Sequence, residues 1–366
     1  MKKIQLWGLT EAELAAECKA KGLPAFRGKQ IFGWLQQKNV ADFAAMTNLP
    51  KKLTAELNDW ADIALPEIIR EQQSADGQTI KLLLDFGENI LVEIVLMVYE
   101  REHSRNRRTI CISTQAGCAM GCKFCATGIN GLERNLTAAE IVAQVIVGNR
   151  WCVSHGLEGI SNVVYMGMGE PLANFENVVQ SIAVLNEKNG LNIGQRKMTV
   201  STCGLAPQIR RLADLKLQIG LAVSLHAPTD EIRSRLMPVN DRYKIAELLA
   251  ACDYYAEQTG RRISYEYALL KNVNDSPNFA HLLGRLLANR LAHVNLIPVN
   301  YVQETGFYPA DIESIRQFSE IVESYKVETT KRERKGSDID AACGQLRKRV
   351  KDNQPMCEEY REDGGV

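Results

Sequence analysis

From about residue 109 onward, short apolar runs alternate with longer amphipathic segments. The apolar runs lie at 109–114, 162–168, 197–202, 218–224, 263–270 and 294–298. The amphipathic segments lie at 138–154, 175–187, 206–215, 245–259, 279–289 and 311–325. Short strands separated by helices are typical of βαβ crossovers, which build a parallel sheet. Six such units predict an α/β fold with a partial (β/α)6 barrel, in which chemistry takes place at the carboxyl ends of the strands.

The chain before this alternation has a different pattern. Its first 85 residues are mostly polar and helical in pattern, with helical stretches at 26–34 and 49–61. Apolar runs at 79–86 and 89–97 flank a turn at Gly87-Glu88 and predict paired strands. We therefore expect a small helical accessory domain over 1–85, a core over 86–350 and a polar tail over 351–366.

Composition indicates an ordinary soluble protein without identifying a partner. Of the 366 residues, 45% are hydrophobic and 24% are charged. Basic and acidic residues each total 44, so the net charge favours neither a nucleic-acid nor a membrane partner. The N-terminus lacks the apolar segment of a secretory signal, and no run is long enough to span a bilayer. We expect a cytoplasmic protein with no membrane partner.

Four of the ten cysteines fall between residues 111 and 125. Thiols in a cytoplasmic chain stay reduced unless they are catalytic or bind a metal, so this clustering favours metal chemistry. Cys118, Cys122 and Cys125 have the spacing CxxxCxxC, which suits three irons of a cubane and leaves the fourth iron open. A structural zinc site normally needs four protein ligands, and Cys111 on the preceding strand is a poor fourth ligand. A zinc knot or chance clustering is the alternative.

This loop resembles the signature of the radical S-adenosylmethionine (SAM) enzymes. In that superfamily, CxxxCxxC follows the first barrel strand, and SAM ligates the open iron through its amino and carboxylate groups. Residues 167–171 (GMGEP) match the superfamily's glycine–glutamate–proline motif after the second strand, where glycines allow close backbone approach. The resemblance implies a [4Fe–4S] cluster and SAM as cofactors.

Further motifs resemble the RlmN family of adenine methyltransferases. They are VSTCG (200–204), AVSLHAP (222–228), EIRSRLMPVN (231–240), NLIPVN (295–300) and GSDIDAACGQL (336–346), together with FRGKQIFGW (26–34) and DFAAMTNLPKKL (42–53). The resemblance covers nearly the whole chain. It implies methylation of carbon-2 of adenine in 23S rRNA (adenosine 2503, in the peptidyl-transferase region) and in tRNA (adenosine 37), with two SAM molecules per turnover. It also implies a cytosolic reductant such as flavodoxin or ferredoxin, and we expect a monomer.

The resemblance also assigns roles to individual residues. It implies that Cys343 takes a methyl group from SAM and, as a radical on that group, bonds to the adenine. It implies that Glu93 accepts the proton from carbon-2. Cys111 is implied to release the product through a transient disulfide with Cys343. The implied SAM contacts are Gly169, Glu170, Ser201, Ser224, Leu225, His226 and Asn300, and the implied cluster ligands are Cys118, Cys122 and Cys125.

The local pattern alone leaves other interpretations of these residues open. Glu93 alternates with apolar neighbours, which by itself indicates a solvent-facing strand position. Cys111 and Cys343 are also typical of small buried side chains, and His226 of a core histidine. Cys203 departs from the family pattern, because serine is expected at its position.

Contacts with RNA have modest support in the sequence. The segment between Glu93 and Cys111 is longer than in most relatives. It contains Arg101, Arg105, Arg107 and Arg108. These arginines either contact RNA phosphates or form a solvated basic turn. Further candidates for a basic face are Arg27, Lys29, Lys51, Lys52, Arg196, Lys197, Arg261, Arg262 and the run 331–335. Two alternative functions stay open: a carbon-8 adenine methyltransferase of the Cfr-like resistance type, and a non-catalytic metal-binding RNA-binding protein.

Overall fold

One ten-stranded sheet organises the structure, which is a computed structural model. The structure describes residues 3–99, 106–129, 131–300, 305–332, 336–341 and 344–346. Cys343, Cys357, Arg101, Arg105 and the expected tail over 351–366 lie outside the described residues.

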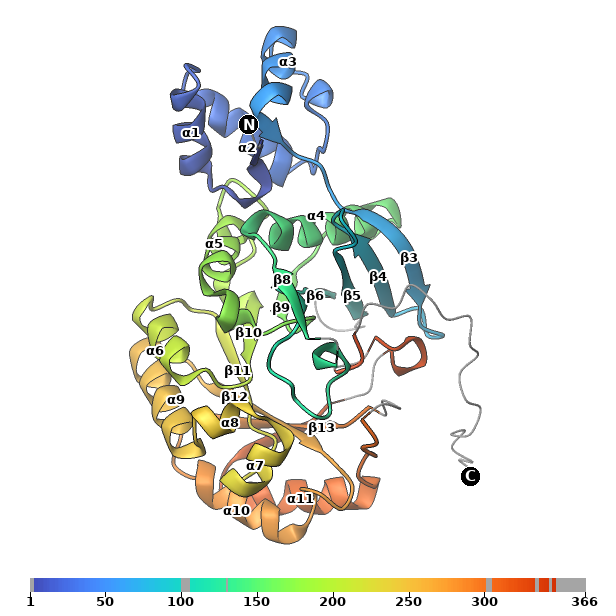
Figure 1. The fold of residues 1–366 in the computed structure, drawn as a ribbon, viewed down its shortest axis with the longest axis vertical. Helices are drawn as coiled ribbons and strands as arrows, with labels where there is room; N and C mark the ends of the chain where they lie inside the picture. Colours follow the sequence, from blue (N-terminus) through green and yellow to red (C-terminus); the bar gives the residue numbers. More distant parts are fainter. Residues whose placement is uncertain are drawn as a thin grey trace.

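Seven strands of this sheet are parallel and follow one another in chain order. They are β6 (Arg107–Cys111), β9 (Asn162–Tyr165), β10 (Met198–Thr202), β11 (Gly220–Ser224), β12 (Ile263–Leu269), β13 (Ala292–Pro298) and β14 (Glu328–Lys331). The connecting helices are α4 (Ala138–Ser154), α5 (Phe175–Asn186), α6 (Ala206–Asp214), α7 (Asp230–Leu236), α8 (Val239–Arg242), α9 (Ile245–Thr259), α10 (Pro277–Leu287) and α11 (Ile312–Ser324). Six strand–helix units therefore precede β14, and the predicted partial (β/α)6 barrel is confirmed (Figure 1).

The barrel stays open because the outer side of β6 pairs with an antiparallel extension. The expected strand pair is confirmed, with its turn at Gly87-Glu88, where φ is +85° and +53°. Where the accessory domain ends stays a prediction, although pairing with the core sheet already starts at Glu67. The extension contains β3 (Glu67–Gln73), β4 (Thr79–Asp85) and β5 (Leu91–Tyr99), and a separate small hairpin contains β7 (Gln115–Gly117) and β8 (Leu132–Asn135).

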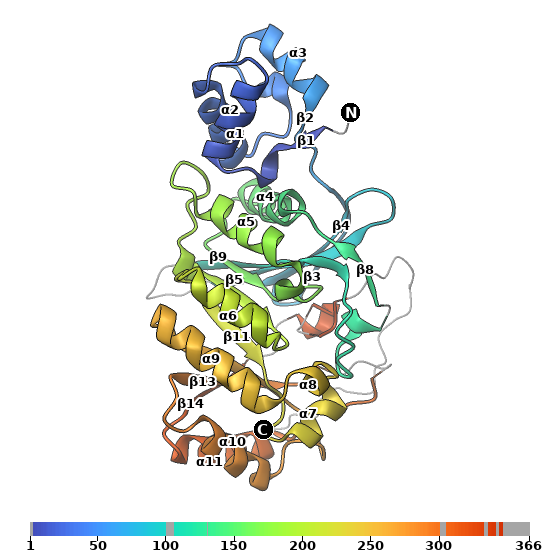
Figure 2. The same ribbon diagram turned by 60° about the vertical axis from the view of Figure 1, so that its left-hand side comes forward.

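A small helical unit precedes the sheet and lies at one end of the molecule, next to α4 and α5 (Figures 1 and 2). It packs closely there, because a Cβ atom on Gly8 would lie 2.7 Å from the Ala139 nitrogen at the start of α4. The side chain of Gln180 on α5 also donates a hydrogen bond to the Gly8 carbonyl at 3.0 Å. Both expected N-terminal helices are present. The unit contains β1 (Ile4–Gln5), α1 (Glu11–Ala20), α2 (Phe26–Gln36), α3 (Lys51–Trp60) and β2 (Ala61–Asp62).

The two faces of the parallel sheet differ in character. Val200, Tyr265, Tyr267, Val294 and Leu296 are at most 1% exposed and belong to the main hydrophobic core. Burying such side chains between sheet and helices stabilises each by about 1.5–3 kcal/mol. The residues that alternate with them are largely polar and less buried, so the opposite face is available for chemistry. Within the described part of the chain, no helix combines the length and apolar character needed to cross a membrane.

Candidate active site

The three clustered cysteines lie at the tip of the β7–β8 hairpin. Cys118, Cys122 and Cys125 are all partly buried. The loop begins with Gly117, whose φ is +75° and where a Cβ atom would lie 2.1 Å from the carbonyl oxygen of Gly131. The same carbonyl accepts the Cys118 N–H at 2.8 Å. The start of the loop is therefore a turn that only glycine fits.

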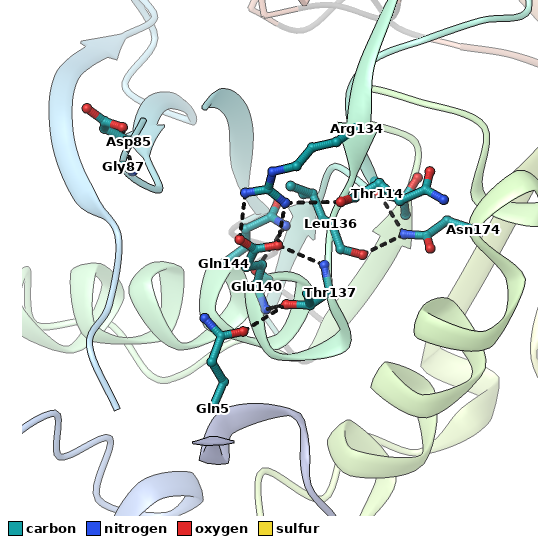
Figure 3. A network of polar contacts seen from close by, with 11 residues as sticks. Gln5, Asp85, Gly87, Thr114, Arg134, Leu136, Thr137, Glu140, Gln144 and Asn174 are labelled. Carbon is teal, nitrogen blue, oxygen red and sulfur yellow. Dashed lines mark hydrogen bonds and ion pairs between the residues drawn. The ribbon is translucent and has the colours of Figure 1, made fainter. Parts of the chain in front are cut away.

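The base of this hairpin is held by a polar network around Asn174 (Figure 3). The Asn174 side-chain nitrogen donates to the carbonyls of Thr114 (2.9 Å) and Leu136 (2.7 Å). Thr114 directly precedes β7, and Leu136 directly follows β8. Beside it, Arg134 on β8 makes two hydrogen bonds of 2.8 Å to the carboxylate of Glu140 on α4. That carboxylate also completes the capping box of α4. These contacts fix the hairpin relative to the barrel.

Cys118 and Cys122 hold their protons in the absence of a metal. Burial raises the pKa of Cys118 to about 11 and raises that of Cys122 further, and the neighbouring thiols add to both effects. A bound metal must therefore displace these protons. In the described ranges, no three His, Cys, Asp or Glu side chains converge on one ion. A cubane needs no such convergence, because each thiolate binds a different iron, so the donor set fits a [4Fe–4S] cluster better than zinc.

Strand register places Glu93 and Cys111 on the same face of the sheet. Cys111, the last residue of β6, pairs with Val95 of β5 and with Val164 of β9. Paired residues point to the same face, and Glu93 is two residues from Val95 along β5. Glu93 and Cys111 are therefore diagonal neighbours, with Cα atoms about 7–8 Å apart. Both lie at the carboxyl edge of the parallel strands.

The same register carries this face to the SAM contacts expected on β10 and β11. Val164 pairs with Thr199, and Ser201 follows two residues later on β10. Ser201 pairs with Ala222, and Ser224 follows two residues later at the end of β11. Ser201 and Ser224 thus share a face with Cys111. The structure brings together side chains that are more than 100 residues apart in the chain.

Glu93 is buried, and the solvent-facing position indicated by its alternating pattern is wrong. Only 5% of Glu93 is exposed, and its Oε1 lies 3.4 Å from the Nζ of Lys81 on β4. Lys81 also donates to the Asp340 carbonyl at 3.2 Å. Glu93 is covered because β5 is an interior strand and the distant segment 336–341 packs beside it. The ammonium group of Lys81 and the carboxylate of Glu93 therefore form a buried ion pair.

Cys343 lies outside the described residues, but its described neighbours in the chain contact the site on two sides. On one side, a Cβ atom on Gly336 would lie 2.7 Å from the Thr79 side chain on β4. On the other side, the carbonyl of Gly344 accepts the N–H of Ala126 at 2.8 Å, directly after the cysteine loop. Residues 336–341 therefore lie beside the strands next to Glu93, and residues 344–346 lie beside the cysteine loop.

Gly169 and Glu170 connect the ends of β9 and β10. Gly169 has φ +100°, and a Cβ atom there would lie 2.5 Å from the Gln115 side chain, so glycine is required. Glu170 is buried, and its carboxylate accepts the N–H groups of Cys203 (2.7 Å) and Leu172 (2.9 Å). Burial raises the pKa of Glu170, and these hydrogen bonds oppose the shift. Cys203 thus lies beside the glycine–glutamate–proline motif.

The residues after β11 turn toward the cysteine loop. The N–H groups of Leu225 and His226 both donate to the Glu266 carbonyl, at 3.1 and 3.2 Å. The ring of His226 meets that of Phe124 edge to face, with centroids 4.7 Å apart. Its Nδ1 accepts the Ala268 N–H at 2.9 Å, so the proton of the neutral ring is on Nε2. Asn300, after β13, is buried at 8% exposure.

We expect His226 to stay neutral down to a pH of about 3, because burial lowers its pKa to about 3. The pKa of histidine in an unfolded chain is about 6.5, so as the pH falls the unfolded chain binds the extra proton before the folded protein does. The stability linked to His226 is therefore complete above that pH and is lost as the pH falls toward 3. In His226→Asn, the pH slope of the unfolding free energy should be smaller by up to about 1.4 kcal/mol per unit below neutrality. Urea unfolding across this range measures both slopes, and equal slopes would contradict the prediction.

Of the four arginines in the basic segment, the structure describes Arg107 and Arg108, which begin β6, and Arg108 differs from both expected roles. Arg108 is buried, and its Nε donates to the Gly159 carbonyl at 2.8 Å. Its guanidinium also pairs with Glu158 at 2.5 Å. Arg108 is therefore neither a phosphate contact nor part of a solvated turn. Arg107 is exposed, with its guanidinium 4.2 Å from the ring centroid of Tyr99.

Comparisons with known proteins agree with this architecture. Residues 4–63 match the family model "Ribosomal RNA large subunit methyltransferase N-terminal domain", and residues 112–283 match the radical SAM superfamily model. Proteins named probable dual-specificity RNA methyltransferase RlmN from Clostridium perfringens and Alkaliphilus oremlandii are 47% and 48% identical to this chain. These matches cover 93% and 95% of this chain, and 95% and 99% of the relatives. A radical SAM methyltransferase from Sphaerobacter thermophilus has a crystal structure that superposes with a TM-score of 0.90 at 46% identity, covering 94% of this chain and 99% of that one.

An open (β/α)6 barrel with a CxxxCxxC loop after its first strand defines a radical SAM enzyme, with a [4Fe–4S] cluster and SAM as cofactors. Within that class, this chain belongs to the RlmN family of RNA methyltransferases. The resemblance expected from the motifs is thereby confirmed over nearly the full length of the chain.

Three residues of the site were not predicted from the sequence. Lys81 pairs with Glu93, Asn174 holds the cysteine hairpin, and Arg233 lies fully buried beneath the ends of β10 and β11. Arg233 belongs to the EIRSRLMPVN motif, which marked the family but indicated no role for any of its members. Lys81 and Asn174 have no local sequence signal, because their partners are distant in the chain.

Proposed function

We propose that this chain methylates carbon-2 of adenine in both 23S rRNA and tRNA by means of a methyl group carried on Cys343. The observation that carries the proposal is the placement of Glu93 and Cys111 on one sheet face, at its carboxyl edge. The segment on either side of Cys343 contacts both β4 and the cysteine loop. The dual-specificity relatives named above support the choice of RNA substrates.

The cofactors are held by residues from several strand ends. Cys118, Cys122 and Cys125 bind the cluster, and together the cluster and SAM supply one-electron chemistry that breaks an unreactive carbon–hydrogen bond. Glu170 and the polar groups at the ends of β10, β11 and β13 orient SAM. The proposed SAM contacts are Gly169, Glu170, Ser201, Ser224, Leu225, His226 and Asn300.

The chemistry of the substrate explains why two further side chains are needed. Carbon-2 of adenine lies between two ring nitrogens and is electron-poor, so it resists direct attack on an electrophilic methyl group. A carbon radical on the Cys343 sulfur adds to this position instead. To restore the aromatic ring, carbon-2 must then lose its proton and the ring must lose one electron, which the cluster would accept. Glu93 is the proton acceptor, with Lys81 stabilising its charge at 3.4 Å.

Release of the product requires a second thiol. Cys111 attacks the sulfur of Cys343, which forms a disulfide and breaks the carbon–sulfur bond to the base. The electron pair of that bond goes to the departing carbon, which takes a proton and becomes the methyl group. The thiols are thereby oxidised, and a cytosolic reductant such as flavodoxin or ferredoxin is proposed to supply electrons to the enzyme.

Replacing Cys111 with alanine is expected to trap the RNA on the protein, because the adduct forms normally and has no thiol to release it. The measurement is a gel-shifted protein–RNA band that survives denaturation and disappears after nuclease digestion. Cys252→Ala, a buried thiol on α9 away from this face, should show no such band. Absence of the band in Cys111→Ala would remove Cys111 from the release step.

RNA is proposed to approach along the N-terminal unit as well as the barrel. Lys29, Lys51 and Lys52 are exposed on α2 and α3, and Arg196 and Lys197 are exposed before β10. The target adenine must leave its stack to reach the carboxyl edge of the sheet. We further propose that the enzyme acts as a cytoplasmic monomer.

The function is tested by reconstituting the cluster anaerobically and supplying SAM, a reductant and either a 23S rRNA fragment or tRNA. Nucleosides from the digested RNA are then identified by mass spectrometry against synthetic standards. We expect 2-methyladenosine in both RNAs. 8-Methyladenosine would instead favour the carbon-8 alternative. A colourless, zinc-only protein that modifies neither RNA would favour the non-catalytic one.

A further inference from the structure

Arg233 on α7 is a completely buried cation, and its hydrogen-bond acceptors among the described residues are all uncharged. Its Nη1 donates to the side-chain oxygen of Asn240 at 2.9 Å. The other acceptors are backbone carbonyls at the ends of β10 and β11, namely those of Cys203 (2.6 Å), Ser224 (3.1 Å) and Leu225 (3.2 Å). Asp230, on the same helix, instead accepts the backbone N–H of Ile245 at 2.9 Å.

A buried charge that is hydrogen-bonded only to dipoles is costly, since removal of an ion from water costs several kcal/mol (about 20 in the idealised limit). The attraction of Asp230 for the guanidinium offsets only part of this cost. Carbonyl oxygens recover part of this cost, but a methionine or leucine would fill the same volume without it. The position of Arg233 therefore suggests that a negative charge lies nearby in the cofactor-bound enzyme.

The cysteine loop is the group beside it. Ile232 and Leu236 of α7 form a small apolar cluster with Cys203, and Cys122 and Phe124 pack against that cluster. The Lys123 N–H donates to the Leu236 carbonyl at 2.9 Å, so the loop is bonded directly to the end of α7.

We propose that Arg233 is the buried counter-charge of the iron–sulfur cluster and raises its reduction potential. The inference rests on the cluster proposed for the cysteine loop. A fixed positive charge stabilises the cluster form that holds one more electron, and a buried site screens this interaction weakly. Arg233 acts through the cluster and touches no reacting atom, so it is a positioning and charge-balancing residue.

The test measures the midpoint potential of the reconstituted cluster in an anaerobic redox titration followed by electron paramagnetic resonance. Arg233→Gln should have a more negative potential than the wild type, because the charge is lost. Arg233→Lys keeps the charge and should stay near the wild type, although it loses several carbonyl bonds. Arg235→Gln, at an exposed position of the same helix, is the matched control and should not shift. Equal shifts in Arg233→Gln and Arg233→Lys, or no shift in Arg233→Gln, would overturn the proposal.

A second pair of variants leaves Arg233 in place. Asn240→Asp puts a carboxylate where Nη1 now bonds at 2.9 Å, and the potential should again become more negative. Asn240→Ala removes the amide without adding charge. It should leave the midpoint potential unchanged, even if the variant protein is less stable. Unchanged potential in Asn240→Asp would contradict the counter-charge role. Iron content is measured first, so that the two proposals are tested separately. A wild-type protein without a cluster would reject the proposed function. A full cluster with unshifted potentials would reject only the role of Arg233.

Discussion

Replacing Cys122 with alanine is expected to abolish the iron–sulfur cluster and to reduce RNA methylation to background. Three thiolates are the full set of protein ligands available from the loop, and a methyl group cannot bind iron. Cys122 packs at the margin of a small apolar cluster, so the variant should still fold. Iron and sulfide content, visible absorbance and nucleoside mass spectrometry measure the outcome.

Cys152→Ala is the matched control for this experiment. It also removes one thiol, from a fully buried position on α4, but that thiol is not in the loop. The control should retain a full cluster and RNA methylation. A Cys122→Ala protein with normal iron content and activity would show that this thiol is not a cluster ligand.

Replacing Glu93 with glutamine is expected to lower kcat by about 10²- to 10⁴-fold, the usual contribution of a positioned general base. The amide cannot accept the carbon-2 proton, whereas cluster content and SAM binding should be unchanged. Stability should also fall, by about 3 kcal/mol, because Lys81 is left as a buried charge without its carboxylate. Single-turnover kinetics and urea unfolding measure the two effects.

The double variant Glu93→Gln/Lys81→Met separates chemistry from folding. It removes both charges of the buried pair, so stability should recover relative to Glu93→Gln alone. Activity should not recover, because the proton acceptor is still absent. Recovery of activity together with stability would mean that Glu93 supports the fold and is not the base.

The sequence predicted the parallel strands and their helices well because these elements combine apolar runs with long amphipathic partners. It missed elements in which that contrast is weak. β14 is a polar edge strand, Glu328–Lys331, and is largely exposed. The helix α7 is only 7 residues long, and α8 only 4, too short for a helical period to stand out.

The residues of the site likewise fall into two groups: some could be predicted from local motifs, and others depend on partners that are distant in the chain. The cysteine spacing and the strand-end motifs are local, so the cluster ligands and the candidate SAM contacts were expected from the sequence. Burial of Glu93 depends on Lys81 and on Asp340, which is 259 residues from Lys81. Arg233 depends on carbonyls at two strand ends, and carbonyl positions have no sequence signature.

In the proposed reaction, the methyl group passes through Cys343 on its way to RNA. The most direct measurement is peptide mass spectrometry of the protein purified from cells, covering the peptides that contain Cys343 and Cys111. We expect a methyl group on the sulfur of Cys343 and none on Cys111. A protein that methylates RNA while its Cys343 stays unmodified would contradict this expectation.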